Sequence, residues 1–405
     1  GCIVESGSAE YTYFTSISAY NYFQQGGDSL LVTRVVTGSY TSATSSIVTG
    51  SSGTDGNVFT LETLSEGAIA NSVGTTGSNG TLTNGTKDNL RWEIVSPSTS
   101  SGTFNLLVRR GDDTTTSKTI LETWSDLSLD PNSTNYIEKV IGNSKQVVTT
   151  DGGDTYVKNE GTYNTLSNFV RVKSVSSKTL NYFDNNGTAK SEYTASIPLA
   201  GSGSFTGAVG APFQTNEAKF YENIDATDTQ GLVPANYAIS LQLLANRDAY
   251  RYNLITAPGL CNSLTGHAAQ ITTMINNSEF RGDNIAVVDL VPWGTGLNSV
   301  TAQAASRDTS YAAAYWPWLQ TIDPDLGGLV WVPASAMIPG VYAFNDRAGE
   351  AWFAPAGLNR GGLGTVVRAE RKLTNGNRDT LYQGNVNPIA TFPNTGVVVF
   401  GQKTL

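Results

Sequence analysis

The chain has 405 residues, and its 34 acidic residues outnumber its 25 basic residues, which gives a net charge of -9. Hydrophobic residues make up 39% of the chain, enough for a folded core, whereas charged residues make up only 15%, so we expect a surface rich in Ser, Thr, Asn and Gly. A single His and two Cys exclude sites built from several imidazoles or from clustered thiolates. We expect Cys2 and Cys261 to be buried free thiols. An acidic chain without a run of Lys and Arg argues against direct binding of nucleic acid, and the absence of a long apolar run argues against insertion into a membrane.

The first predicted elements are a helix and a strand. Aromatic and apolar residues recur at helical spacing from residue 13 to residue 23, and Gly26-Gly27 then predicts the end of the helix. The following apolar run over residues 30–36 predicts a buried strand. Residues 37–60 are rich in Ser, Thr and Gly, and no basic residue lies between Arg34 and Lys87, which predicts loop or exposed strand.

The middle of the chain reads as mostly β-structure. Alternating or apolar runs predict strands over residues 58–64, 90–95, 104–110, 119–124 and 168–175. Residues 90–95 and 104–110 are expected to pair antiparallel. Within this region, residues 130–143 have the pattern of a helix that ends at Gly142, and residues 201–210 read as a glycine-rich loop.

The last part of the chain returns to an α/β pattern. A short helix is expected within residues 235–250. Apolar runs at 252–259 and 284–292 flank an amphipathic segment at 267–281, which predicts a parallel strand–helix–strand unit. A final buried strand is expected at 396–403.

These patterns predict a chain that is α/β plus mostly β. We expect a discontinuous α/β core domain formed by residues 1–36 and 222–405. A β-rich inserted domain of residues 37–221 interrupts it.

Three residues are candidates for enzyme chemistry. Asp289 ends a predicted parallel strand, where open α/β sheets bind ligands, but its simpler role is to cap backbone N–H groups in the turn over residues 291–296. Cys261 and His267 together have the residue types of a nucleophile and its base. The simpler interpretation makes Cys261 a buried thiol and His267 a residue of the first helical turn. No second acid, base or metal ligand lies near Asp289 in sequence, so we expect no catalytic site.

Two glycine motifs resemble nucleotide-binding loops without matching them. In the segment from Gly80 to Lys87, Thr86 takes the position that a phosphate-binding loop gives to lysine. The glycines at 201, 203 and 207 are spaced one residue too widely for a dinucleotide-binding fingerprint. We therefore interpret both as turns and expect no cofactor.

The remaining motifs also have structural interpretations. Arg-Gly-Asp occurs at 110–112 and 281–283, where a strand or helix is predicted to end in a turn. Asp112-Asp113 and the pair Asp151 and Asp154 lack the spacing of a calcium-binding loop. We expect the aromatic residues of one cluster to pack in a core or a subunit contact: Tyr311, Tyr315, Trp316 and Trp318.

The last hundred residues carry motifs in a familiar order. SYAAAYWPWL (310–319) precedes VPASAMIPGVYAFND (332–346) and AWFAPAGLNRGGL (351–363), and DTLYQGNVNPI (379–389) precedes GVVVFGQKTL (396–405). Together with ISAYNYFQQGGDSLLVTRVV (17–36) and looser likenesses in the middle, this order resembles the tail sheath proteins of contractile phages of the T-even type.

The resemblance implies a structural protein and no enzyme. Such subunits form stacked hexameric rings around a tail tube and contract to drive the tube through the host envelope, which supports host cell entry and genome ejection. The implied partners are copies of the chain itself, the tail tube protein, the baseplate and the tail terminator. The implied location is the virion tail, after assembly in the host bacterial cytoplasm.

Relative to the family pattern, we expect amino- and carboxyl-terminal extensions to be missing. Because those extensions add strands to neighbouring subunits in the family, we expect this fragment to be monomeric. Two other functions remain open from sequence: a secreted or surface β-rich glycan-binding protein or hydrolase, and the sheath of a phage-derived injection machine.

Overall fold

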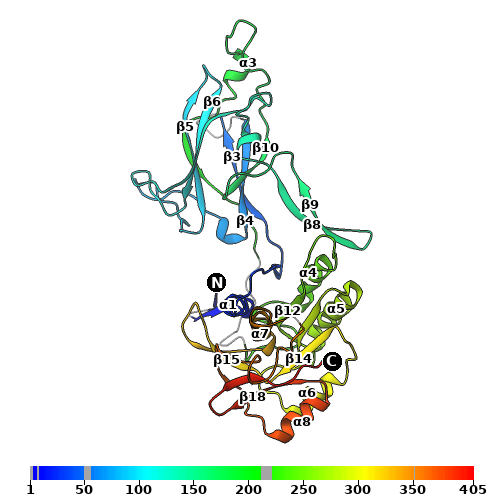
Figure 1. The fold of residues 1–405 in the computed structure, drawn as a ribbon. Helices are drawn as coiled ribbons and strands as arrows, with labels where there is room; N and C mark the ends of the chain where they lie inside the picture. Colours follow the sequence, from blue (N-terminus) through cyan, green and yellow to red (C-terminus); the bar gives the residue numbers. More distant parts are fainter. Residues whose placement is uncertain (1–2, 7–8, 50–55, 211–220, 351) are drawn as a thin grey trace. The chain divides into compact units, whose positions relative to one another are not determined.

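The computed structural model of the chain (Figure 1) describes residues 3–6, 9–49, 56–210, 221–350 and 352–405. Cys2 lies outside these residues, so its predicted burial has no structural counterpart here. The expected mixture of helices and several sheets is confirmed.

The chain divides into two compact units. One unit contains residues 1–37 and 213–405, and we call it the α/β unit. The other contains residues 38–212, and we call it the β-rich unit. Both units are drawn in Figure 1, and each is described separately below.

A five-stranded sheet forms the centre of the α/β unit. Its strands lie in the order β12 (Leu254–Cys261), β13 (Ile285–Asp289), β14 (Ala312–Trp316), β18 (Asn387–Phe392) and β19 (Gly396–Val399). Neighbours from β12 to β18 pair in parallel, and β19 pairs antiparallel with β18. The predicted parallel strand–helix–strand unit is therefore confirmed.

Helices cover both faces of this sheet because successive residues of its strands point to opposite sides. On one side, Ala286 and Val288 pack with Ile271 and Met274 of α5 (Thr265–Arg281). On the other side, Val287 belongs to the core that contains α7 (Ala334–Ala348). The continuous apolar runs that sequence analysis identified are thus buried on both faces.

The helix predicted at the start of the chain is α1 (Phe14–Gln24). Phe14 is buried and packs edge-on against Trp318, with ring centroids 6.0 Å apart. The helix ends where Gly26 adopts a φ of +99°, a conformation that favours glycine. Gly340 of α7 lies so close to Asn21 that a Cβ there would come within 2.4 Å of its amide nitrogen, so α1 and α7 pack closely.

The buried strand predicted at residues 30–36 is wrong. The segment belongs to no strand, and Leu30, Leu31 and Val32 are exposed, Val32 by 61%. Its composition suits a strand, but no sheet in the described part of the chain pairs with it. A strand is buried only when a neighbouring strand pairs with it, and the composition of the segment does not show whether such a neighbour exists.

Smaller elements complete the α/β unit. A second sheet has the order β16-β15-β17, and a two-stranded sheet joins β1 to β2. Three backbone hydrogen bonds join the loop over residues 357–363 to the outer edge of β19. The remaining elements are β1 (Ile3–Ser6), β2 (Ala9–Thr12), η2 (Pro234–Asn236), α4 (Tyr237–Leu244), α6 (Leu297–Ala304), β15 (Leu319–Ile322), β16 (Leu329–Val332), β17 (Val366–Ala369) and α8 (Asn375–Gln383).

The β-rich unit contains three sheets among the described residues. One has the order β11-β5-β6-β7, another β10-β4-β3, and the third is the hairpin β8-β9. Phe59 and Phe104 stack in the core between elements of the first two sheets, with ring centroids 5.6 Å apart. The strands are β3 (Ser42–Val48), β4 (Asn57–Glu66), β5 (Leu90–Ser98), β6 (Thr103–Arg110), β7 (Ile120–Ser128), β8 (Lys145–Asp151), β9 (Asp154–Glu160), β10 (Val170–Val175) and β11 (Gly201–Ser204). The short helices are η1 (Ala68–Ala70), α2 (Ile137–Val140) and α3 (Ser191–Thr194).

Strands predicted in this unit are present, including the antiparallel pair β5 and β6. Two predictions are wrong. The helix expected over residues 130–143 is the single turn α2, although Gly142 ends it as expected with a φ of +101°. The glycine-rich loop expected over 201–210 begins as strand β11, which pairs with β5. The pairing uses backbone hydrogen bonds, so a strand can form here although the sequence has no alternating apolar residues that would predict it.

Candidate functional site

The enzyme candidates lie together at the carboxyl ends of β12 and β13. Asp289 is buried, and its Oδ1 accepts a hydrogen bond of 3.1 Å from the backbone N–H of Ser335. Its Oδ2 accepts a second bond of 2.5 Å from the Ser335 hydroxyl. The prediction that Asp289 caps the turn at 291–296 is therefore wrong, because its carboxylate caps the first turn of α7 instead. Burial raises the pKa of Asp289 to about 7, and the hydrogen bonds from Ser335 oppose this shift.

Cys261 and His267 do not form a nucleophile–base pair. The His267 Nδ1 accepts a hydrogen bond of 3.1 Å from the backbone N–H of Cys261, not from its thiol. Both side chains are buried. Burial raises the pKa of the Cys261 thiol and lowers the pKa of His267, so both stay neutral. Such a sealed thiol is unreactive, because thiolate is the nucleophilic form.

The two Arg-Gly-Asp motifs are held by internal ion pairs. Arg281 donates two hydrogen bonds of 3.0 Å to Asp283 and stacks over the ring of Tyr252. At the other copy, Arg110 pairs with Asp112 at 2.5 Å. In each motif the basic and acidic groups bind one another, which agrees with the structural interpretation of both as turns.

The acidic pairs considered for calcium serve other purposes. Asp113 accepts two short hydrogen bonds of 2.7 and 2.8 Å from Arg109. It also forms an ion pair with Arg91, and the side chains of Asp113, Arg109 and Arg91 are all buried. Asp151 and Asp154 face each other across the turn of the β8–β9 hairpin. Across the described residues, no three His, Cys, Asp or Glu side chains gather in a way that would hold a metal ion. Likewise, none of the helices described here is both long and apolar enough to span a membrane.

The aromatic cluster packs in the core, as expected. Tyr315, Trp316 and Trp318 are buried, whereas Tyr311 is half-buried. The Trp318 indole N–H donates to the carbonyl of Val291 at 3.0 Å. Tyr315, Trp316 and Trp318 therefore pack in the core of the α/β unit, where their buried rings are not available for stacking on a ligand.

The glycine motifs remain turns or strands. Gly80 has a φ of +71° and its carbonyl accepts a hydrogen bond from buried Arg91. Gly203 lies in β11 against the ring of Trp92, where a Cβ would come within 2.4 Å of the indole. Neither motif opens a helix, so neither provides the N–H cluster that binds phosphate.

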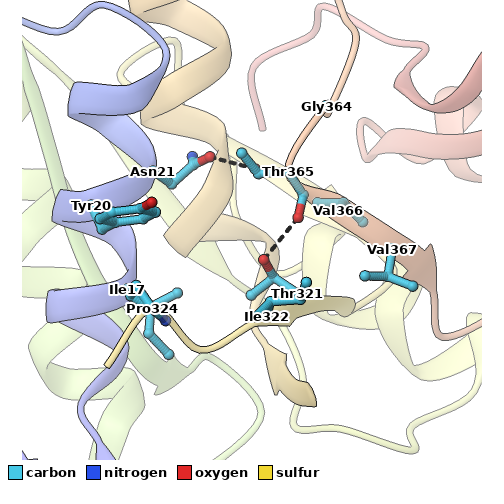
Figure 2. A pocket seen from close by; sticks show the side chains of 10 residues that line it. All are labelled: Ile17, Tyr20, Asn21, Thr321, Ile322, Pro324, Gly364, Thr365, Val366 and Val367. Atoms are coloured by element: carbon cyan, nitrogen blue, oxygen red, sulfur yellow. Dashed lines mark hydrogen bonds between the residues drawn. The ribbon is translucent and has the colours of Figure 1, made fainter. Parts of the chain in front are cut away.

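A pocket of about 380 Å³ lies between α1 and the second sheet of the α/β unit. Figure 2 shows Asn21 and Tyr20 of α1 beside the segment around Thr365. The Thr365 hydroxyl donates to Asn21 Oδ1 at 2.6 Å, and the Thr321 hydroxyl donates to the Thr365 carbonyl at 2.9 Å. Its lining consists of Ile17, Tyr20, Asn21, Thr321, Ile322, Pro324, Gly364, Thr365, Val366 and Val367. This lining has no carboxylate, imidazole or cation for catalysis.

One surface feature escaped the sequence analysis. Arg378 of α8 lies over the rings of Phe392 and Phe400, at 5.2 and 5.6 Å from their centroids. Lys403 lies over Tyr382, at 4.2 Å. These basic residues are separated in sequence, so the chain shows no basic run, yet the fold brings Arg378 on α8 and Lys403 of the carboxyl-terminal segment to the same helix. The excess of basic over acidic residues near the carboxyl end of the sequence could have predicted a basic surface here.

Comparisons with known proteins agree with the resemblance seen in the sequence. Residues 222–405 match the family described as the phage tail sheath protein central domain. The tail sheath protein of Vibrio phage KVP40 is 33% identical over 123 residues, which are 29% of this chain and 18% of that protein. The tail sheath protein of Enterobacteria phage T4 is 34% identical over 119 residues, again 29% of this chain and 18% of the relative.

A third relative and a solved structure are also similar. The tail sheath protein of Salmonella phage ViI is 29% identical over 177 residues, covering 42% of this chain and 27% of that protein. The crystal structure of a sheath tail protein from Listeria innocua covers 89% of this chain and 54% of that chain, with 10% identity and a TM-score of 0.44. The chain thus matches well under a third of the length of each of these curated relatives.

The resemblance to contractile phage tail sheath proteins is therefore confirmed, and the match to the central domain of that family spans residues 222–405. This is a family of structural proteins of the phage tail, not of enzymes. The buried side chains of Asp289 and His267, which are hydrogen-bonded within the fold, are compatible with a structural protein.

Proposed function

We propose that this chain is part of a contractile tail sheath subunit that polymerises as stacked hexameric rings around a tail tube. Contraction of the sheath would drive the tube through the host envelope. The observation that supports this most strongly is the match of residues 222–405 to the sheath central domain.

Physical considerations agree with this role. Head-to-tail contacts between identical subunits that do not close into a ring produce helical assemblies. Subunit interfaces with two discrete packings convert a local trigger into a large motion. In this proposal the free energy of contraction is stored when the subunits assemble, so the chain needs no nucleotide, cofactor or catalytic residue.

The proposed partners are copies of the chain, the tail tube protein, the baseplate and the tail terminator. The proposed location is the virion tail, reached after assembly in the host bacterial cytoplasm. We propose no direct contact with nucleic acid and no membrane insertion.

The domain assignment leads to a proposal about orientation in the sheath. Residues 1–36 and 222–405 face inward and make most contacts between subunits, whereas residues 37–221 face outward. Cross-linking of assembled sheaths, followed by mass spectrometry, tests this. Cross-links between copies that fall mainly within residues 37–221 would contradict it.

Electron microscopy of the full-length gene product tests the function itself. We expect cylinders of two lengths, extended and contracted, and a DNA-filled head attached to them would distinguish a virion from an injection machine. Isolated particles that turn over a glycan, with turnover lost on replacement of Asp289 or His267, would overturn the proposal in favour of a hydrolase.

A further inference from the structure

His267 is the only histidine of the chain, and its imidazole lies at a junction of several elements of the α/β unit. The side chain is fully buried in the first turn of α5, just after the turn that follows β12. Its Nδ1 accepts the 3.1 Å hydrogen bond from the backbone N–H of Cys261. Since a backbone N–H can only donate, Nδ1 carries no proton, and the ring is the neutral tautomer with its proton on Nε2.

The loop over residues 225–231, which we call the latch loop, packs against the start of α5. The carbonyl of Ala226 lies so close to Gly266 that a Cβ there would come within 2.1 Å of it. The loop also reaches the ring of His267, whose Nε2 is buried. No described residue is placed to accept a hydrogen bond from this Nε2, so the bond at Nδ1 is what orients the ring.

The latch loop is also joined to β12 and to α1. The Thr229 hydroxyl donates to the Gly259 carbonyl at 2.8 Å, and both residues are at the end of β12 or beside it. The Gln230 side-chain amide donates to the Pro258 carbonyl at 3.1 Å, and its Oε1 accepts from the Phe14 N–H at 2.9 Å. Gln230 has a φ of +57°, which is uncommon outside glycine, so these contacts hold the loop in a conformation of raised energy.

A second proton on His267 would break this junction at its centre. Imidazolium carries N–H groups at both ring nitrogens, so Nδ1 could no longer accept from Cys261, and two donors would face each other inside the fold. The first turn of α5 is the positive end of the helix dipole, which disfavours a cation there. Burial lowers the pKa of His267 below its ordinary value of 6.5, and the backbone carbonyl and the charge of Asp225 oppose this shift.

The carboxylates nearest to the ring are those of the latch loop, and both are engaged within the loop. Asp225 is exposed, and its Oδ1 accepts hydrogen bonds from the N–H groups of Thr227 and Asp228 at 2.7 and 3.0 Å. Asp228 is half-buried, and its Oδ1 accepts from the Gly231 N–H at 3.1 Å. Neither provides a buried counter-ion for an imidazolium.

The other elements around the ring add no counter-ion. On β12 the titratable group is the Cys261 thiol, and beside η2 it is the phenol of Tyr237; burial raises the pKa of both, so both are neutral. Asp289 at the end of β13 is bound to Ser335. Arg307, which follows α6, donates to the Ala268 carbonyl at 3.3 Å and adds a positive charge near the same helical turn.

We propose that His267 is an acid-sensitive latch, whose protonation releases the latch loop and the first turn of α5 from the end of β12. The sheets and the rest of the α/β unit stay folded when the latch opens. In the open state the ring is in water and binds its proton with the ordinary pKa of 6.5, whereas the closed state binds it poorly. Acid therefore favours the open state by at most about tenfold per pH unit, and above about pH 7 the latch stays closed.

Hydrogen–deuterium exchange of the 405-residue chain, read by mass spectrometry at about pH 7.5 and about pH 5, tests this. After correction for the intrinsic pH dependence of amide exchange, peptides over residues 225–231 and 261–268 should exchange up to about thirtyfold faster at the lower pH. Peptides from β14 and from the β-rich unit should show no such change. The pattern separates a local opening from global unfolding.

His267→Asn is the matched variant, because its Oδ1 can accept from the Cys261 N–H in place of Nδ1 but its amide does not take up a proton. We expect its corrected exchange to differ by less than about twofold between the two pH values. Asp289→Asn removes the other buried titratable group at this end of the sheet and should keep the acid response. Since the chain has one histidine, its single imidazole Cε1–H signal in proton NMR should titrate with a midpoint below 6.5.

Three results would overturn the proposal. The first is corrected exchange of the latch loop that does not change with pH. The second is an undiminished acid response in His267→Asn, folded by circular dichroism. The third is equal acceleration in the latch loop and in β14. If His267→Asn does not fold, the NMR titration of the parent chain decides, because a midpoint at or above 6.5 contradicts a buried acceptor ring. The latch goes beyond the sheath role, and none of these results bears on the electron microscopy test.

Discussion

Asp289 at the end of β13 and Ser335 at the start of α7 are joined by two hydrogen bonds of 3.1 and 2.5 Å. They are 46 residues apart in sequence, and both are buried. The pair attaches α7 to the central sheet and satisfies an N–H group that the helix itself leaves without a partner.

The raised pKa of Asp289 predicts that stability falls as pH rises. Its ordinary value is 3.8 and burial raises it to about 7 in the folded chain. The folded state therefore holds a proton that the unfolded state releases between these pH values, so the stabilising effect is full below pH 4 and is lost as pH rises through 7. The slope is at most about 1.4 kcal/mol per pH unit. Urea unfolding at pH 5 and pH 7 should show a smaller pH difference in Asp289→Asn than in the parent chain. Equal differences in the two proteins would contradict the assignment.

Removal of the Ser335 hydroxyl should destabilise the α/β unit. Ser335→Ala leaves the buried Asp289 Oδ2 without its donor, which costs about 1–3 kcal/mol. Ser299→Ala, at an exposed position of α6, is the matched control and should change the free energy of unfolding by less than about 0.5 kcal/mol. Similar effects of the two substitutions in urea unfolding would argue against the role given to Ser335.

The buried ion pair in the β-rich unit predicts a sharp contrast between adjacent aspartates. Asp113→Ala leaves the guanidinium groups of Arg109 and Arg91 buried without their carboxylate, which costs about 3–5 kcal/mol. Asp112→Ala removes only an exposed pair with Arg110 and should cost less than about 1 kcal/mol. Thermal unfolding of both variants measures the contrast. A larger loss from Asp112→Ala would contradict the burial described here.

Gly142 should tolerate no side chain. It has a φ of +101°, and a Cβ there would lie 2.2 Å from the Thr165 Cα, so Gly142→Ala combines backbone strain with a backbone clash. We expect a loss of at least about 2 kcal/mol. Gly187 has a φ of +78° with open space around its Cβ direction, so Gly187→Ala should cost only about 1 kcal/mol. The comparison by urea unfolding fails if the two losses are equal.

The exposed segment at residues 30–36 predicts a third contrast. Leu31→Ser and Val32→Ser remove apolar area that is already in water, so the free energy of unfolding should change by less than about 0.5 kcal/mol. Val287→Ser, in the buried centre of β13, should cost several times more, about 2 kcal/mol or above. A large loss from Val32→Ser would show that the segment is buried in the folded chain.

Sequence patterns predicted the α/β unit where the signal was strong and local. The apolar runs at 252–259 and 284–292 became β12 and β13, and the amphipathic residues between them became α5. The same reasoning failed at residues 30–36, because an apolar run predicts a strand but says nothing about its partner. It missed the β8–β9 hairpin, although Asp151-Gly-Gly-Asp154 is a typical two-residue hairpin turn.

The chemistry of the site residues depended on contacts that sequence does not reveal. The position of Asp289 at a strand end was predictable, but its bond to Ser335 depends on how α7 packs. The clustering of Arg378 with Lys403 required the return of the chain after β19 beside α8. Long-range placement of this kind comes from the tertiary fold.

The covering of β19 by the loop over residues 357–363 limits how neighbours can attach at that side of the sheet. Gly357 and Leu363 donate backbone hydrogen bonds to β19, and Val399 donates one to Gly361, so these main-chain groups of β19 are already paired and cannot bond an incoming strand. Any copy that meets this side must do so through side chains. Side-chain contacts can be exchanged a few at a time, so adjoining molecules could shift relative to each other without breaking a row of main-chain hydrogen bonds.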